Sequence, residues 1–310
     1  MSRGNMSLNN FIVLGGEVAA ALAARQPVVA LESTIITHGM PYPQNLKTAR
    51  LVEDEVRAGG AAPATIAVLE GRIHVGLSDE ELNDLAQTNG AWKLSRADLA
   101  VALAQKVTGA TTVAATMICA HLAGLDVFAT GGIGGVHRGA AESFDISADL
   151  RELSQTPVTV VAAGAKAILD LEKTLEVLET LGVPVIAVGQ DGFPAFWSQT
   201  SGLPAPLRLD TAAEIAEAHR MRARLGLPGG QLIANPIPAD EAIPLDQLRP
   251  LIDTALDAAA ASSISGKAVT PYLLQYLYEA TAGKSLTANI ALVRNNARLA
   301  AQIASELCKQ

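Results

Sequence analysis

The chain of 310 residues has few cysteines, few aromatic residues and no block of basic residues. Its two cysteines, Cys119 and Cys308, cannot build a disulfide framework or a four-cysteine zinc site. Aromatic residues make up 4% of the chain and apolar residues as a whole 49%, so small aliphatic side chains must form the core. The net charge of −8 argues against a nucleic-acid polymer as partner, although a small anionic ligand needs only a local pocket.

The chain also lacks an unbroken apolar run of membrane-spanning length, and its N-terminal MSRGNMSLNN has no apolar signal core. We therefore expect a cytoplasmic protein in which residues 1–10 form a disordered arm. The length suits one large α/β domain or two small ones. Because no internal repeat or clear linker divides the chain, we predict a single domain over residues 1–310.

Short apolar runs alternate with stretches of helical periodicity, which is typical of strand–helix–strand units with right-handed parallel crossovers. Strands are predicted over residues 28–31, 127–130, 158–163, 183–188 and 232–238, with a hairpin of 64–69 and 72–77. Helices are predicted from Asn45 through Arg57 and over residues 97–107, 117–125, 168–181, 211–226, 245–261 and 286–307. Residues 189–209 are predicted as a loop. The simplest architecture is one three-layer α/β domain.

Two apolar runs stop at a charged residue, as strands of parallel sheets do where they present chemistry at their carboxyl ends. Glu32 follows VVAL, and Lys166 follows VVAAGA. Desolvation would favour the neutral, nucleophilic amine of Lys166, which can form an imine with an aldehyde, and Glu32 would serve as general acid or base. A solvent-reaching lysine at a helix start and a capping or salt-bridging glutamate are the open alternatives.

The glycine run GGIGGVHRG follows the predicted strand at 127–130. Its backbone N–H groups suit an anion, with His137 and Arg138 adding positive charge. The run fails the dinucleotide-binding fingerprint because His137 stands where the third glycine belongs. The alternative interpretation is a mobile loop.

Asp145, Ser147 and Asp149 alternate in FDISADL and would point the same way from an extended segment. Their oxygens suit Mg²⁺ or Mn²⁺, or the hydroxyl groups of a sugar, and an aspartate-rich turn is the alternative. The segment GATTVAATM offers hydroxyl and N–H groups to an anion or a base edge, or simply caps a helix. Lys93 and Asn289 carry no signal in isolation.

Taken together, these stretches resemble the pseudouridine-5′-phosphate glycosidase family, which includes the indigoidine synthase A-like proteins. The resemblance covers most of residues 28–305. It rests on ALESTIITHGMPYPQN, GATTVAATMICAHLAG, VFATGGIGGVHRGAAESFDISADL, AGAKAILD, GFPAFW, LIANPIP and SLTANIALVRNNARLAAQIA. It implies an α/β/α sandwich with a mixed, largely parallel sheet, assembled as a homotrimer.

The resemblance implies reversible cleavage of pseudouridine 5′-phosphate to uracil and ribose 5-phosphate. The ribose ring would open, Lys166 would form an imine at C1′, and the iminium would serve as electron sink while the uracil carbon leaves. Glu32 would protonate that carbon. Asp145 matches the ligand of one mostly water-ligated Mn²⁺. The residues matched to substrate contacts are Lys93, Val113, Ser147, Ala148 and Asp149, with Thr130, His137 and Asn289 placed near the phosphate.

The chain departs from the family pattern around Lys166, where Ala163-Gly164-Ala165-Lys166-Ala167 stands in place of the usual Cys-Ala-Gly-Val-Lys-Ser, and in the loop Gly189–Trp197, which lacks an expected acidic residue and tyrosine. Three other hypotheses stay open. They are an imine-forming aldolase acting on a phosphosugar, a non-enzymatic regulator that binds a sugar phosphate, and a pigment-pathway relative that handles another C-nucleoside phosphate.

Overall fold

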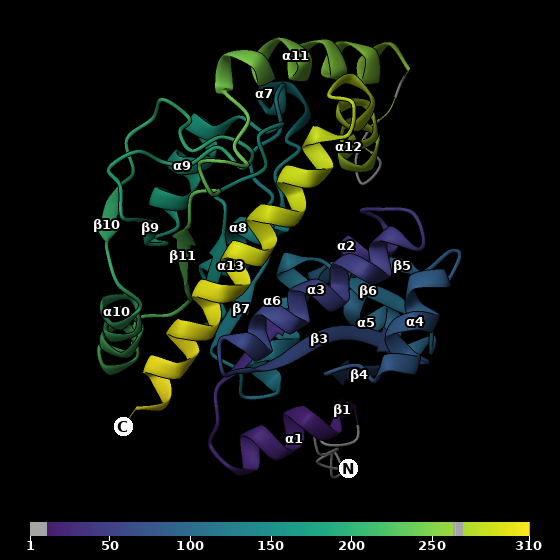
Figure 1. The fold of residues 1–310 in the computed structure, drawn as a ribbon, viewed down its shortest axis with the longest axis vertical. Helices are drawn as coiled ribbons and strands as arrows, with labels where there is room; N and C mark the ends of the chain where they lie inside the picture. Colours follow the sequence, from purple (N-terminus) through teal and green to yellow (C-terminus); the bar gives the residue numbers. More distant parts are fainter. Residues whose placement is uncertain (1–10, 263, 265–268, 310) are drawn as a thin grey trace, which may run out of the picture.

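The computed structural model describes residues 11–262, 264 and 269–309 (Figure 1). The predicted arm at residues 1–10 lies outside this range. In the described part of the chain, the strands are β1 (Ile12–Leu14), β2 (Val28–Leu31), β3 (Ala62–Leu69), β4 (Arg72–Val75), β5 (Trp92–Leu94), β6 (Gly109–Thr111), β7 (Val127–Ala129), β8 (Thr159–Ala162), β9 (Val185–Val188), β10 (Leu207–Leu209) and β11 (Gln231–Ala234).

These strands form one sheet in the order β1-β4-β3-β2-β7-β8-β11-β9-β10, with β6 pairing β3 and β5. Between these strands, antiparallel pairing is confined to β3 with β4 and β3 with β6. In the part of the sheet with the order β2-β7-β8-β11-β9-β10, every strand is parallel to the next. The prediction of a mixed, largely parallel sheet is therefore confirmed, as is the hairpin at its turn Glu70-Gly71.

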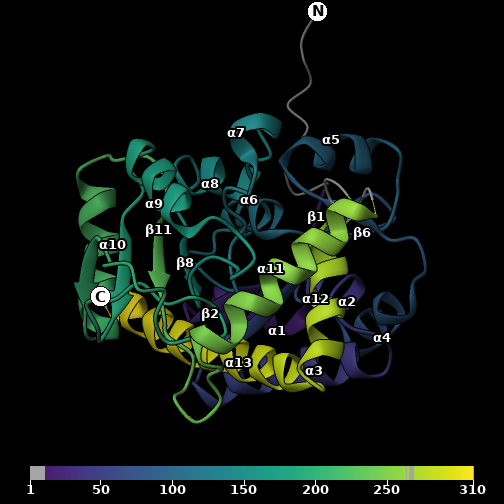
Figure 2. The same ribbon diagram turned by 90° about the horizontal axis from the view of Figure 1, so that it is seen from above.

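Helices cover both faces of the sheet (Figure 2). They are α1 (Gly16–Ala23), α2 (Thr34–Thr37), α3 (Gln44–Ala58), α4 (Asp79–Gln87), α5 (Arg96–Ala104), α6 (Val113–Leu122), α7 (Ala140–Ser143), α8 (Ala148–Leu153), α9 (Leu171–Thr180), α10 (Ala212–Arg224), α11 (Leu245–Ala261), α12 (Val269–Ala280) and α13 (Lys284–Cys308). The long helix α13 crosses β2, β7 and β8 and contacts α3 and α10, whereas α6 and α8 pack together on the opposite face. This arrangement is the predicted α/β/α sandwich.

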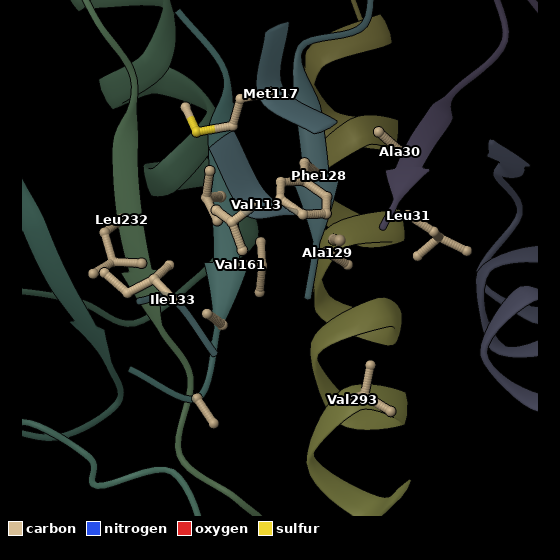
Figure 3. Close-up of a cluster of buried hydrophobic side chains, with 14 of the residues drawn as sticks. Ala30, Leu31, Val113, Met117, Phe128, Ala129, Ile133, Val161, Leu232 and Val293 are labelled. Atoms are coloured by element: carbon tan, nitrogen blue, oxygen red, sulfur yellow. The ribbon is translucent and has the colours of Figure 1, made fainter. Parts of the chain in front are cut away.

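The core lies between α6, the central strands and α13 (Figure 3). Val113 and Met117 of α6 lie on one side of Phe128, and Val293 of α13 lies on the other. All four side chains are buried. Because most other core residues are alanine, valine or leucine, the helices approach the sheet closely, as the low aromatic content predicted.

Several predicted boundaries were wrong for local reasons. Asn45 does not cap α3, which begins at Gln44; its buried side chain donates to the carbonyl oxygens of Ile36 and Ala86, both at 2.8 Å. Residues 189–209 are not all loop, because β10 pairs with β9 at the sheet edge, where Leu207 is exposed and leaves no apolar signal. The predicted strand 232–238 ends at Ala234, before two prolines.

Some elements were missed altogether because they are short or irregular in pattern. These are β1, β5, β6, α1, α2, α7, α8 and α12. The helix α12 begins with Val-Thr-Pro, and its proline occupies the first turn, where it costs no helical hydrogen bond. No helix in the described ranges is long and apolar enough to cross a bilayer. The single-domain assignment stays a prediction.

Candidate active site

The carboxyl ends of β2, β5, β6, β7 and β8 meet at a cavity of about 380 Å³. This is the edge at which parallel sheets place ligands, and the volume suits a small molecule. Helices α12 and α13 add one wall, near the end of the molecule where α13 begins (Figure 1). The predicted site residues that line the cavity are Glu32, Lys93, Val113, His137, Asp145, Ser147, Ala148, Asp149, Lys166 and Asn289.

Glu32 is held rigidly at the end of β2. Its two carboxylate oxygens accept hydrogen bonds from the hydroxyls of Thr34 and Thr130. The next residue, Ser33, is fully buried; its hydroxyl donates to the carbonyl of Ile66 at 2.6 Å and accepts from the N–H of Thr111 at 2.9 Å. The carboxylate therefore enters the cavity from a fixed backbone with a fixed orientation.

Thr130 lies behind Glu32 rather than in the cavity lining, and its predicted place near the phosphate stays a prediction. The side chain is 1% exposed, and its hydroxyl serves Glu32. Its carbonyl accepts from Nδ2 of Asn296 at 2.8 Å, and Oδ1 of Asn296 accepts from Asn235 at 3.0 Å. This buried amide pair, from α13 and from the residue that follows β11, fixes Thr130, which in turn fixes Glu32.

Lys166 lies on the turn after β8 and shares the cavity with Glu32. Its N–H donates to the carbonyl of Ile133 at 3.1 Å, and its own carbonyl accepts from Leu169 at 3.0 Å. The turn needs glycine at position 164, where φ is +82° and a Cβ would lie 2.6 Å from the carbonyl oxygen of Pro194. The half-buried lysine is thus carried by a turn that is anchored on both sides.

The glycine run after β7 forms a packed wall of the cavity. The N–H of Ile133 donates to Gly164 at 3.1 Å, and the N–H of Gly134 donates to Oδ2 of Asp149 at 2.8 Å. A Cβ on Gly132 would lie 2.7 Å from the ring of Phe196. Glycine is therefore required for close packing, and these two N–H groups are not available to an anion.

The segment FDISADL does not present its polar residues from an extended strand, so the prediction from alternation was wrong. Ser147 caps α8, and its hydroxyl accepts from the N–H of Asp149. Asp149 is buried, and its oxygens accept from the N–H groups of Ala114 and Gly134 at 2.9 and 2.8 Å. Asp149 thus joins the start of α6 to the glycine run, whereas the carboxylate of Asp145 is exposed at the cavity.

The positive charge at the cavity does not come from His137 and Arg138. Burial lowers the pKa of His137, with Lys166 and Lys93 adding to the effect against the opposing charge of Asp145, so the imidazole is neutral at pH 7. Arg138 is exposed and forms an ion pair with Asp253 on α11. The lysine side chains that line the cavity are Lys93 and Lys166.

Further lining residues gave no signal in the sequence. His38 follows α2, and burial together with the charge of Lys93 lowers its pKa. The apolar part of the cavity wall includes Phe196, Leu274 and Leu292. In the sequence, these residues cannot be told apart from core residues. The role of Thr34 could have been predicted from the sequence only by noting that it stands two residues after Glu32, close enough to donate a hydrogen bond to that carboxylate.

The donor set suits a hard cation held mainly by water. Among the residues that the structure describes, no three His, Cys, Asp or Glu side chains cluster as a metal site. Asp145 has a side chain that is 40% exposed, with its Oδ2 4.0 Å from Nδ1 of His137. In the described residues, a carboxylate that has one imidazole nitrogen 4.0 Å away and belongs to no cluster of three such side chains fits Mg²⁺ or Mn²⁺ better than Zn²⁺.

Comparisons with known sequences place the chain among enzymes of one kind. The family described as indigoidine synthase A like protein matches residues 17–306. The chain is 70% identical over 291 residues to the pseudouridine-5′-phosphate glycosidase of Jannaschia sp. (strain CCS1), covering 94% of this chain and 96% of that protein. It is 55% identical over 302 residues to the protein of that name from Caldanaerobacter subterraneus subsp. tengcongensis, covering 97% and 98%.

Solved structures share the fold over nearly the whole chain. The prealnumycin C-glycosynthase AlnA in complex with ribulose 5-phosphate has a TM-score of 0.89 at 40% identity, covering 96% of this chain and 97% of that one. An indigoidine synthase A-like protein of Thermotoga maritima has a TM-score of 0.87 at 34% identity, with the same coverage.

Proposed function

The chain belongs to the family of indigoidine synthase A-like proteins, and we propose that it cleaves the carbon–carbon glycosidic bond of pseudouridine 5′-phosphate through an imine at Lys166. The enzyme has pseudouridine-5′-phosphate glycosidase activity, as do relatives 70% and 69% identical to it. The observation that carries the mechanism is that Glu32, which follows β2, and Lys166, which follows β8, line the same cavity.

A bond between two carbons needs an electron sink, because protonating a leaving oxygen does not release the base. The amine of Lys166 bonds to C1′ while the bond from C1′ to the ring oxygen breaks, and the ring oxygen takes a proton from Glu32. The resulting carboxylate then removes a proton from the new ammonium group. The side chain of Glu32 therefore regains the proton it will need for the uracil carbon.

Glu32 next protonates C5 of uracil. The electron pair of the C1′–C5 bond returns to the uracil ring, and the nitrogen lone pair of Lys166 forms the iminium at C1′ as that bond breaks. Water adds to the iminium, releases ribose 5-phosphate and restores the free amine. Rigid placement by Thr34 and Thr130 supports this role, since one carboxyl group must exchange protons in turn with the ring oxygen, the nitrogen of Lys166 and C5 of uracil.

The phosphate lies at the cationic side of the cavity, near Lys93 and the start of α6. Val113 is the first residue of that helix, so its N–H is among those that no helical carbonyl accepts. Ser147, Ala148 and Asn289 line the cavity within reach of the sugar and base. Reversibility of the reaction, the homotrimer and a cytoplasmic location stay predictions.

A direct assay tests the activity against the alternatives. The purified protein should release uracil and ribose 5-phosphate in equal amounts from pseudouridine 5′-phosphate, as measured by liquid chromatography. A phosphosugar aldolase would instead produce shorter sugar fragments and no base, and a regulator would bind without turnover. A C-nucleoside phosphate with another base, turned over faster than the uracil compound, would point to a pigment-pathway enzyme.

Asp145 would hold a divalent cation, Mn²⁺ in our proposal, through its one carboxylate and bound water. When bound, the cation supplies positive charge that offsets the phosphate and sugar oxygens beside it. Treatment with a chelator should therefore lower the rate by roughly tenfold or more, and Mn²⁺ but not Zn²⁺ should restore it.

Chelation followed by addition of Mn²⁺, repeated with the variant Asp145→Asn, distinguishes a metal ion held by Asp145 from one bound elsewhere. The variant should show a low rate that Mn²⁺ does not raise, because the anionic ligand is lost while the side-chain shape is kept. If the chelated wild-type enzyme retains its full rate, Asp145 is not a metal ligand.

A further inference from the structure

The segment Gly192–Trp197 (GFPAFW) is fixed to the turn that carries Lys166. The N–H of Phe196 donates to the carbonyl of Ala163 at 2.9 Å, three residues before the lysine. The carbonyl of Trp197 accepts from Ile243 at 2.8 Å. Trp197 is 1% exposed and stands behind the cavity lining, so it does not touch a substrate itself.

The indole of Trp197 determines which end of the Asn289 amide faces the cavity. Its Nε1–H donates to Oδ1 of Asn289 at 2.9 Å. An indole N–H is a donor only, so the amide oxygen must face Trp197, and the NH₂ group must face the other way. Asn289 lines the cavity from α13. The amide thus presents two donors to a ligand and no acceptor.

Packing holds the indole in this orientation. The ring of Phe196 meets Trp197 edge to face, with centroids 5.0 Å apart and planes at 64°. Phe196 in turn packs against Gly132, where any Cβ would clash with its ring. The backbone of Phe196 is left-handed, at φ +59°, a conformation that costs free energy and persists only where contacts on both sides enforce it.

We propose that Trp197 is a positioning residue that locks the Asn289 amide with its NH₂ group toward the cavity, so that the enzyme selects an oxygen acceptor on the substrate at this point. Phosphate oxygens and uracil carbonyl oxygens are both acceptors of this kind. The choice of substrate rests on the proposed function, whereas the amide orientation does not.

Trp197→Phe keeps an aromatic ring at this position and removes the N–H donor. We expect KM for pseudouridine 5′-phosphate to rise about tenfold with kcat changed less than about threefold, since the lost contact binds substrate and transition state alike. Trp92→Phe, at an exposed position, is the matched control and should leave both constants unchanged. Unchanged KM in folded Trp197→Phe would overturn the proposal.

Asn289→Asp tests the orientation without disturbing the indole. One carboxylate oxygen can still accept from Trp197, and the other replaces the NH₂ group with an acceptor, so substrate affinity should fall roughly a hundredfold. In the Trp92→Phe background, the remaining indole N–H resonance in a ¹⁵N spectrum should shift on this change even without substrate. An unmoved resonance would refute the hydrogen bond whatever the enzyme's activity.

Binding of the separate products identifies the acceptor. Calorimetry of Trp197→Phe with ribose 5-phosphate and with uracil should show weaker binding of one of them. Weaker binding of ribose 5-phosphate would assign the Asn289 contact to the sugar phosphate, and weaker binding of uracil would assign it to a carbonyl oxygen of the base. Wild-type affinity for both would contradict the proposed selection.

Discussion

Replacing Lys166 by alanine should reduce turnover of pseudouridine 5′-phosphate by at least about a thousandfold, because removing a covalent nucleophile eliminates the pathway rather than weakening it. The fold should survive, since the residue is half-buried on the cavity wall and its backbone hydrogen bonds do not depend on the side chain. Uracil release by the variant, followed over hours, measures the effect.

Borohydride trapping locates the covalent bond directly. Wild-type enzyme treated with ribose 5-phosphate and borohydride should gain the mass of the sugar phosphate less one oxygen atom, and peptide mapping should place it on Lys166. Lys173→Ala is the matched control, because that lysine is exposed on α9 and ion-paired with Asp170 at 2.6 Å. Its variant should keep wild-type turnover and labelling. An adduct on another lysine would reassign the nucleophile.

The positions of Lys166 and Glu32 were predictable because buried parallel strands are continuous apolar runs in the sequence. Four consecutive buried residues of β2 precede Glu32, and the buried strand β8 precedes the turn to Lys166. Chain order alone could not show that β2 and β8 lie on either side of β7. The strand pattern suggested that the two residues act together, and the family resemblance gave each of them a role.

Roles that depend on long-range partners were not predictable. Asp149 looked like a ligand beside Asp145, but its partners are N–H groups 35 and 15 residues away. Thr130 looked like an ordinary strand end, and only the packing of β2 against β7 shows that it holds Glu32. The charge of His137 likewise depends on burial by distant elements.

Glu32→Gln should lower kcat between about a hundredfold and ten-thousandfold, because the amide keeps the size of the side chain but cannot pass protons to the ring oxygen and to C5 of uracil. KM should change little, since the variant retains the shape of the cavity and every lysine. Rapid-quench measurement of uracil formation in a single turnover shows whether the chemical step is the one slowed.

Thr130→Val separates proton transfer from orientation, because it leaves the carboxyl group in place and removes one of the hydroxyls that aim it. We expect a loss of roughly tenfold, smaller than that of Glu32→Gln, in keeping with one hydrogen bond to a charged group. Glu142→Gln, on the exposed surface of α7, should have no effect. If Glu32→Gln lost no more activity than Thr130→Val, the carboxyl group would be a structural partner of the two threonines, and the proton that reaches C5 would have to come from another side chain in the cavity.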